Sequence, residues 1–268
     1  NPITSLAQAK DNKCSPFQFV ALYLADGLEE NTDGILGLSP HKDDEKRKLH
    51  YLWALKDSGM ISKAVVAFSL ASLDMKTAYA TFGGINAAQI VGGKEGLSTF
   101  KSFDNFLGTW ALEGNGIKYA GKLLDLTDIS FPAIIDTGTS QMSLPPRIFG
   151  PLQDQWNEAV PGGIDASPTP VFAQPKTMLA RGASSQTCWL CALRPDIHPG
   201  ANAILVQAGD GGKCFFVLSE GKLGGKNKDI YILGVAFLKH FYSVFDFDSN
   251  SISLGINTHS AGKVSIQK

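Results

Sequence analysis

The stretch FPAIIDTGTSQMSLP, residues 131–145, decides how the chain is interpreted. An apolar, β-branched run delivers a single carboxylate, Asp136, into a turn of small hydroxyl and glycine residues, after which the sequence becomes apolar again. The run predicts a strand, Gly138 allows a tight turn, and the threonine hydroxyls can hydrogen-bond near the carboxylate. We therefore identify Asp136 as a candidate catalytic residue. Its supporting turn comprises Thr137, Gly138 and Thr139.

The length of the chain predicts two globular lobes. Its charge balance excludes an electrostatic attraction to nucleic acid. Typical domains run about 100 to 200 residues, and this chain has 268. Its 24 basic and 25 acidic residues nearly balance, with no basic stripe to draw the protein to nucleic acid or an anionic membrane. The best apolar run, AVVAFSLASL at residues 64–73, is about half the length of a bilayer span.

Four cysteines leave two interpretations open, a zinc site or a disulfide. Cys188 and Cys191 have the two-residue gap of a zinc or redox motif, but a structural zinc site normally needs a second pair. A disulfide from one of them to Cys214 is the interpretation we favour, and it would indicate an oxidising compartment. The five histidines are scattered without ligand spacing, so we predict no metal site.

Most of the sequence consists of short runs typical of β-strands, which predicts an all-β fold. The runs are β-branched, aromatic or alternating in polarity, and Gly, Asp and Asn turns separate them. Two hairpins are predicted, with turns at Gly114-Asn115-Gly116 and Asp248-Ser249-Asn250. The predicted strands lie at residues 17–25, 64–72, 78–85, 108–126, 131–138, 203–209, 213–219, 229–234 and 242–256.

Two helices are expected to interrupt the strands. In the first, residues 43–60, an acidic first turn precedes an apolar face, and Gly59 is placed as the C-terminal stop. The second, residues 145–160, opens with prolines, which a first turn tolerates. We expect residues 161–186 to be a loop and residues 257–268 to be a surface strand or a frayed end. The apolar face of the first helix comprises Leu49, Leu52, Trp53 and Leu55.

One short signature occurs twice in the chain. Ile35-Leu36-Gly37 follows an Asp-Gly pair, and Ile232-Leu233-Gly234 follows Asp-Ile-Tyr. Each consists of two aliphatic residues and a glycine, shortly before a helix-like segment. Two lobes with the same internal layout would produce this repetition.

Six motifs follow one another along nearly the whole chain. They are TDGILGLSP (32–40), SGMISKAVVAFSLAS (58–72), TFGGIN (81–86), FPAIIDTGTSQMSLP (131–145), the spacing from Cys188 to LRPDI, and YILGVAFLKHFYSVFDFDSNSISLGI (231–256). Together, in that order, they resemble the pepsin and cathepsin D family of aspartic proteases. One Asp-Thr-Gly alone would be weak evidence, but six ordered matches make accidental similarity implausible.

The resemblance implies an all-β, bilobal pepsin-like acid protease fold with a few short helices, in which each lobe supplies one Asp-Thr-Gly turn. The chain is similar to the family only from the middle of the first lobe onward. We therefore expect half of the N-terminal lobe, with its catalytic aspartate and flap, to be missing from this sequence. The implied ranges are 1–87 for the rest of the N-terminal lobe and the inter-lobe strands, 88–257 for the C-terminal lobe and 258–268 for a tail.

The resemblance also implies roles for single residues. Asp136 corresponds to the second catalytic aspartate, Thr137 would grip the opposite turn, and Thr139 would lie beside the site. Trp110 matches an aromatic residue of a cleft-lining strand, although alone it would be interpreted as a core tryptophan.

Further residues follow from the resemblance or depart from it. The family pattern implies a disulfide between Cys188 and Cys214 and leaves Cys14 and Cys191 unassigned. Val235 stands where an acidic residue usually follows the second Ile-Leu-Gly, and the small cysteine loop that often precedes the second Asp-Thr-Gly is missing. These departures bear on pH behaviour and subfamily more than on the reaction.

The chemistry implied by the family needs two carboxylates. Two carboxylates that lie close together cannot both ionise, so they share one proton. One then acts as a base on a bound water while the other donates a proton to the substrate carbonyl oxygen. Asp136 alone cannot divide these roles, so we expect the partner acid in an N-terminal light chain or another segment of the same precursor.

Two function hypotheses follow. The first is an aspartic endopeptidase acting on an extended polypeptide, with water as the nucleophile and no metal or organic cofactor. The alternative is a catalytically inactive protease-like subunit with a binding or structural role. Pairing of two copies of Asp136 in a homodimer fits poorly, because the chain already carries part of a first lobe.

The start of the chain and the resemblance together suggest its processing and location. The sequence begins at Asn1-Pro2 without an initiator Met or a signal peptide, and we interpret it as a processed or truncated product. The resemblance implies the secretory pathway, with secretion or an acidic compartment like the lysosome or vacuole.

Overall fold

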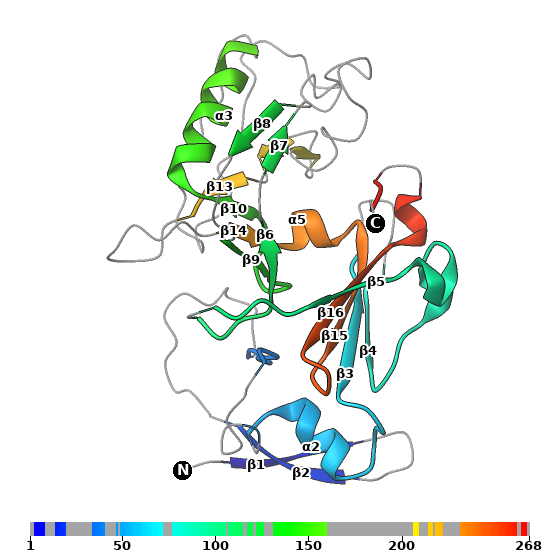
Figure 1. The fold of residues 1–268 in the computed structure, drawn as a ribbon. Coiled ribbons are helices and arrows are strands. Elements are labelled where there is room, and N and C mark those ends of the chain that lie inside the picture. The colour runs from blue at the N-terminus through cyan, green and yellow to red at the C-terminus, as the bar shows by residue number, and fades with distance from the viewer. Residues whose placement is uncertain are drawn as a thin grey trace. The chain divides into compact units, whose positions relative to one another are not determined.

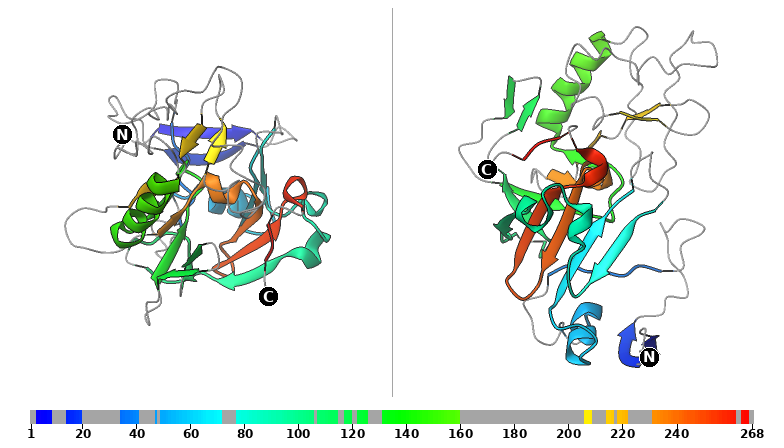
Figure 2. Two further views of the ribbon diagram at one scale, coloured as in Figure 1. Left: turned by 90° about the horizontal axis from the view of Figure 1, so that it is seen from above. Right: turned by 90° about the vertical axis from the view of Figure 1, so that its right-hand side faces the viewer.

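The fold of the described residues is mostly β-sheet with a few short helices, as the sequence predicts (Figures 1 and 2). The computed structural model describes residues 3–8, 14–19, 34–40, 47, 49–71, 77–105, 107–114, 117–119, 122–125, 131–159, 206–208, 214–216, 218–221, 231–261 and 264–266. The chain divides into two compact units. Unit 1 comprises Asn1–Trp110, Phe241–His259 and Ile266–Lys268, and unit 2 comprises Ala111–His240 and Ser260–Ser265. The lobe ranges implied by the family resemblance stay a prediction.

Unit 1 is built around a five-stranded antiparallel sheet. Its strand order is β4-β3-β15-β16-β5, so the last two strands of the chain pair with strands from its first half (Figure 1). Its five strands are β3 (Val65–Ser69), β4 (Tyr79–Phe82), β5 (Ser98–Lys101), β15 (Phe241–Asp246) and β16 (Ser251–Ile256). Alternate residues face the core, where Val65, Ala67, Ile90, Tyr242 and Val244 are buried together.

Smaller elements complete unit 1. Strands β1 (Ile3–Gln8) and β2 (Cys14–Phe19) form a separate antiparallel pair. The 3₁₀ helices η1 (Ala87–Gln89) and η2 (Gly93–Gly96) lie between β4 and β5 in the chain. Predicted strand 17–25 is therefore confirmed only up to Phe19, and its remainder lies outside the described residues.

The first predicted helix, residues 43–60, is confirmed from Tyr51, but residues 49 and 50 are not helical, and residues 43–46 and 48 lie outside the described residues. Helix α2 (Tyr51–Asp57) ends just before Gly59, the predicted stop. The φ of 74° at Gly59 lets its N–H donate to Lys56 O and the N–H of Met60 donate to Leu55 O. The placement of Leu49 on the buried face is wrong. It lies before the helix begins and is 56% exposed. The buried face consists of Leu52, Trp53 and Leu55.

The predicted hairpin at the end of the chain is confirmed. β15 and β16 pair in register from Phe241 and Ile256 to Asp246 and Ser251. The turn between them is stabilised by Asp246, whose Oδ1 accepts hydrogen bonds from the backbone N–H groups of Asp248 and Ser249 at 2.9 and 3.0 Å. Asn250 adopts a φ of 52°, a conformation that asparagine tolerates better than most residues.

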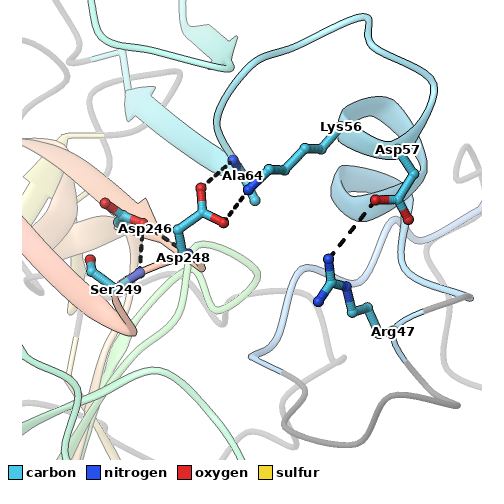
Figure 3. Close-up of polar contacts among 7 residues, drawn as sticks. All are labelled: Arg47, Lys56, Asp57, Ala64, Asp246, Asp248 and Ser249. Atoms are coloured by element: carbon cyan, nitrogen blue, oxygen red, sulfur yellow. Dashed lines mark hydrogen bonds and ion pairs between the residues drawn. The ribbon is translucent and has the colours of Figure 1, made fainter.

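The side chain of Asp248 links this turn to α2 within unit 1. Its Oδ1 accepts a hydrogen bond from Lys56 Nζ at 2.5 Å, and its Oδ2 accepts one from the backbone N–H of Ala64 at 3.0 Å (Figure 3). Arg47 lies nearby, 3.9 Å from Asp57 and with its guanidinium 3.7 Å from the ring centroid of Trp53. We call the contact of Asp248 with Lys56 and Ala64 the Asp248 link.

Unit 2 contains a mixed five-stranded sheet with the order β13-β10-β14-β9-β6. Helix α3 (Pro146–Ala159), predicted at residues 145–160, packs its apolar side against this sheet (Figure 1). Residues from the helix and the strands share one core, namely Ala133, Met142, Leu144, Ile148, Phe149, Leu152, Leu218, Tyr231 and Ala236. The strands are β6 (Ala111–Gly114), β9 (Phe131–Ile135), β10 (Met142–Leu144), β13 (Leu218–Glu220) and β14 (Tyr231–Leu233).

The hairpin predicted with a turn at residues 114–116 is wrong. β6 pairs with β9, and β7 (Ile117–Tyr119) pairs instead with β8 (Lys122–Asp125). Gly114 has a different use. A Cβ atom there would lie 2.2 Å from the ring of Phe131 on β9. Only a residue without a side chain leaves room for this ring. The remaining strands, β11 (Val206–Ala208) and β12 (Cys214–Phe216), form an antiparallel pair.

The prediction of a surface strand or frayed end at residues 257–268 is wrong for residues 257–260. Asn257 is 1% exposed, and its Nδ2–H group donates to Ser69 Oγ at 2.8 Å in unit 1. In unit 2, Ser260 is 1% exposed and its Oγ lies 3.1 Å from Nδ1 of the buried His240. A single turn of 3₁₀ helix, η4 (Thr258–Ser260), spans this region. Side-chain hydrogen bonds fix it, and an apolar pattern cannot reveal them.

Candidate active site

The Asp-Thr-Gly turn lies in a loop between two strands that do not pair with each other. β9 ends at Ile135, and β10 begins at Met142. β14 lies between them, parallel to β9 and antiparallel to β10. Residues 136–141, which we call the arch, therefore cross the carboxyl end of β14. The backbone N–H of Asp136 donates to Leu233 O of β14 at 3.2 Å.

The arch packs directly on Gly234, the residue that follows β14. A Cβ atom at this position would lie 2.1 Å from Gln141 O and 2.3 Å from Thr139 O, so only glycine fits under the arch. Helix α5 (Val235–Leu238) begins immediately afterwards. The N–H of Val235 donates to Thr139 O at 2.7 Å, which fixes the arch through backbone groups.

Two hydrogen bonds from the arch orient the carboxylate of Asp136. The backbone N–H of Gly138 donates to Oδ1 at 2.8 Å, and the hydroxyl of Thr139 donates to Oδ2 at 2.6 Å. The side chain is half-buried, so it keeps access to solvent. These two donors hold the carboxyl group of Asp136 in one orientation.

The structure brings three of the four predicted turn residues into direct contact. Asp136, Gly138 and Thr139 are joined by hydrogen bonds, as expected from their spacing. Thr137 is half-buried in the same arch. Its contact with the turn of the opposite lobe stays a prediction.

Trp110 lies in unit 1 and has the environment of a core tryptophan. It is 5% exposed and packs against Phe245 and Phe247, with ring centroids 5.5 and 4.9 Å away. Its Nε1–H donates to Leu38 O at 2.8 Å. Its assignment as a cleft-lining residue stays a prediction.

The described residues do not test the predicted disulfide. Cys188 and Cys191 lie outside the described residues, so the predicted disulfide between Cys188 and Cys214 stays a prediction. Cys214 lies in β12, opposite Ala208 of β11. Within the described segments, no group of three or more His, Cys, Asp or Glu side chains is placed to hold a metal ion.

The sequence alone does not predict the role of Gly234. The contact between this glycine and the arch joins residues that lie about a hundred positions apart, and no local pattern encodes it. The available signal is the repeated Ile-Leu-Gly signature, because a glycine after two aliphatic residues marks a place where another backbone approaches closely. The departure at Val235 leaves this arrangement intact, since its contribution is a backbone N–H.

A strand–arch–strand unit that presents one oriented carboxylate is the arrangement expected for half of an acid protease site. Residues 23–256 match the family model of eukaryotic aspartyl proteases. The chain belongs to the eukaryotic aspartyl protease family. Membership of this family of hydrolases supports a peptidase function.

Sequence relatives agree with this assignment. The aspartic-type endopeptidase ctsD of Aspergillus fumigatus is 24% identical over 227 residues, which is 82% of this chain and 43% of that protein. A probable aspartic-type endopeptidase CTSD of Trichophyton verrucosum is 26% identical over 93% of this chain and 45% of its own length. Pepsin II-2/3 of Oryctolagus cuniculus is 26% identical over 83% and 53%. The chain thus spans about half the length of the curated relatives it matches.

A solved structure shares the fold. The crystal structure of the aspartic proteinase from Irpex lacteus superimposes with a TM-score of 0.64 and 15% sequence identity, covering 94% of this chain and 79% of that one. The predicted pepsin-like fold class is therefore confirmed. None of the helices among the described residues is long and apolar enough to cross a membrane.

Proposed function

We propose that this chain is part of an aspartic endopeptidase and that Asp136 is one of its two catalytic aspartates. The observation that carries the proposal is the carboxylate of Asp136, the first residue of the arch, held by Gly138 and Thr139. The partner aspartate would come from a segment outside these 268 residues. The relatives, which are about twice as long as this chain, leave room for such a segment.

The geometry suits a carboxylate that handles a proton. Both oxygens of Asp136 are oriented by donors within its own turn, so the carboxylate stays fixed while a water and a substrate bind. With a second carboxylate close by, the pair shares one proton. One member then removes a proton from the water, and the other protonates the carbonyl oxygen of the scissile peptide bond.

The substrate would be an extended polypeptide. An extended chain can form backbone hydrogen bonds along a groove, and pockets for alternate side chains then give specificity. No metal or organic cofactor takes part in the proposed reaction, since water is the nucleophile. A secreted, lysosomal or vacuolar acidic location is part of this proposal and follows from the family resemblance.

Substitution of the aspartate tests the proposal. Asp136→Asn keeps the size of the side chain and an oxygen that can accept the N–H of Gly138, but it removes the ionisable group. We expect cleavage of acid-denatured protein by the complete gene product to fall at least about 100-fold, the usual scale of acid–base catalysis. The measurement is the initial rate of peptide release at acidic pH.

A matched control separates catalysis from folding. Asp154 is an exposed residue of α3 in the same unit, so Asp154→Asn makes the same chemical change away from the arch. This variant should keep the rate of the unsubstituted protein. Full activity of Asp136→Asn would refute the proposal, and a complete gene without a second Asp-Thr-Gly or Asp-Ser-Gly would favour the inactive subunit.

A further inference from the structure

Two aromatic rings lie against each other where the strands that lead to the arch begin. Phe131 is the first residue of β9, and Tyr231 is the first residue of β14. Their ring centroids lie 3.8 Å apart, and the ring planes are inclined by 20°, so the rings are stacked nearly face to face. We call this pair the aromatic stack.

The aromatic stack and the arch lie at opposite ends of the same two strands. β9 and β14 run parallel, and their last residues, Ile135 and Leu233, are register partners. Asp136 follows β9 directly, and Gly234 follows β14. A shift of one strand along the other would therefore move the arch relative to the glycine that supports it.

The aromatic stack depends on the register of the two strands. Tyr231 is paired with Ala133, and Phe131 lies two residues before Ala133, so both rings belong to the same face of the sheet. Because successive side chains alternate between the two faces, a slip of one residue would turn one of the rings to the other face. The contact between the rings therefore stabilises the observed register against such a slip.

Each ring is also held by a neighbouring element of unit 2. On β6, a Cβ atom at Gly114 would lie 2.2 Å from the ring of Phe131, so the ring occupies the space that the glycine leaves. The hydroxyl of Tyr231 accepts a hydrogen bond from Arg147 Nη2 of α3 at 2.9 Å. Tyr231 is 1% exposed, and a tyrosine hydroxyl that is buried normally has such a partner.

We propose that Phe131 and Tyr231 are positioning residues for the carboxylate of Asp136. Their stack fixes β9 on β14, and this sets where the arch begins and where its carboxylate lies. The inference rests on the proposed function, because it identifies residues that determine the place of Asp136 relative to its partner carboxylate.

Two backbone hydrogen bonds connect the strands to the arch. The N–H of Asp136 donates to Leu233 O at 3.2 Å, and the N–H of Val235 donates to Thr139 O at 2.7 Å. Both bonds join the arch to the end of β14 or to the helix that follows it. A displacement of β9 on β14 must therefore bend or break them, and the carboxylate then moves with the arch.

The pH dependence of the reaction reports the spacing of the two carboxylates. Two carboxylates that lie close together keep their shared proton up to a higher pH than a lone carboxyl group would. If Asp136 moves away from its partner, this coupling weakens, and the pair loses the shared proton at a lower pH. The alkaline limb of the kcat/KM profile follows this loss.

Removal of one ring tests the positioning role. In the complete gene product, Phe131→Leu keeps an apolar side chain but abolishes the stack. We expect kcat to fall about 10-fold, KM to stay within about twofold, and the alkaline limb to move by about 0.5 pH units or more toward acid. Tyr231→Leu, which removes the other ring, should reproduce these changes. Tyr231→Phe, which keeps both rings and loses only the hydroxyl, should give smaller ones.

A core substitution outside both strands provides the matched control. Leu152 lies on α3 and is 3% exposed, so Leu152→Ala should lower the stability of unit 2 at least as much as Phe131→Leu does. Measured well below the Tm of both variants, Leu152→Ala should leave KM and the alkaline limb unchanged. If the two variants have the same pH profile, the stack acts only through core packing, and the proposal is overturned.

Hydrogen exchange gives a measurement that needs no hydrolysis. The amides of Asp136 and Val235 donate the two bonds that connect the arch, so their exchange through local opening reports how firmly the arch is held. Both amides should exchange at least about 10-fold faster in Phe131→Leu than in Leu152→Ala. Equal rates in the two variants would overturn the proposal.

The two measurements separate this inference from the proposed function. If the unsubstituted protein cleaves no peptide, the proposed function fails, and the exchange rates alone decide whether the stack holds the arch. If peptide is cleaved and Phe131→Leu leaves the pH profile unshifted, the inference fails, even where exchange is faster, and the proposed function stands.

Discussion

Thr139 holds the candidate catalytic carboxylate through one hydrogen bond, and its loss should be visible in the rate. Its hydroxyl donates to Asp136 Oδ2 at 2.6 Å. Thr139→Val removes the hydroxyl at nearly constant volume. A hydrogen bond to a charged group contributes about 1.5 to 3 kcal/mol. We expect kcat of the complete gene product to fall about 10-fold to 100-fold, with KM changed much less, because this hydrogen bond orients the carboxylate.

The serine variant distinguishes positioning from packing. Thr139→Ser keeps the hydroxyl and loses only the methyl group, so its kcat should stay within about threefold of the original, a change below the effect of losing a hydrogen bond. If the serine and valine variants lose equal activity, the hydroxyl is not the group that matters, and the positioning role of Thr139 is wrong.

At the scale of single residues, the sequence predicts the hydrogen bonds of the Asp-Thr-Gly turn better than it predicts which side chains of the first helix are buried. The spacing of Asp136, Gly138 and Thr139 places donors within one turn of the carboxylate, so local chemistry suffices. Leu49 fits the helical period and is therefore predicted to be buried, yet α2 begins only at Tyr51. The period of a pattern does not locate the end of an element.

At the scale of elements, the packing of the arch depends on Gly234, a residue outside it. Gly234→Ala adds a Cβ atom that would lie 2.1 and 2.3 Å from two backbone oxygens of the arch. Its φ of −86° suits alanine, so the conflict is purely steric. Because backbone oxygens fixed by hydrogen bonds cannot move aside easily, we expect a loss of about 3 kcal/mol or more in the free energy of unfolding. Urea denaturation measures this loss.

A second glycine provides the control for this measurement. A Cβ atom on Gly84 meets nothing within 4 Å, so Gly84→Ala should leave stability unchanged or raise it by up to about 1 kcal/mol. Comparable losses at both positions would show that the close approach to the arch is not what requires glycine at residue 234.

Turn chemistry also shows why strand pairing is hard to predict. Gly114-Asn115-Gly116 has the composition of a hairpin turn, yet β6 pairs with β9. The hairpin forms instead between β7 and β8, where Tyr119 pairs with Lys122. Local turn preference is weak compared with the packing of a strand in a five-stranded sheet, and here the packing decides.

For the whole molecule, length and composition predict two units but not how the chain builds them. β15 and β16 follow the Asp-Thr-Gly unit in sequence, yet they pair with β3 and β5 in unit 1. Such pairing joins residues about 150 to 180 positions apart. Periodicity within a short window therefore identifies the strands but carries no information on this pairing.

The Asp248 link makes the stability of the molecule depend on pH. Partial burial acts to raise the pKa of Asp248, but the hydrogen bonds from Lys56 and Ala64 and the charges of Lys56 and Arg47 outweigh it, so the pKa is lowered. A carboxyl whose pKa is lower in the folded than in the unfolded state stabilises the fold above its unfolded pKa. That stabilisation is lost as the pH falls through the folded pKa, below about pH 4.

The protein should therefore become less stable at low pH, in part because the stabilisation from this contact is lost. This matters for a protein proposed to work at acidic pH. Asp248→Asn keeps an acceptor for Ala64 but loses the charge facing Lys56. At pH 7 the variant should be up to about 1 kcal/mol less stable than the original, since the pair is partly exposed. As the pH falls from about 4 toward about 2, the two proteins should unfold at increasingly similar urea concentrations, and Asp154→Asn should match the original throughout. A difference that persists undiminished at pH 2 would mean that packing, not charge, gives Asp248 its stabilising role.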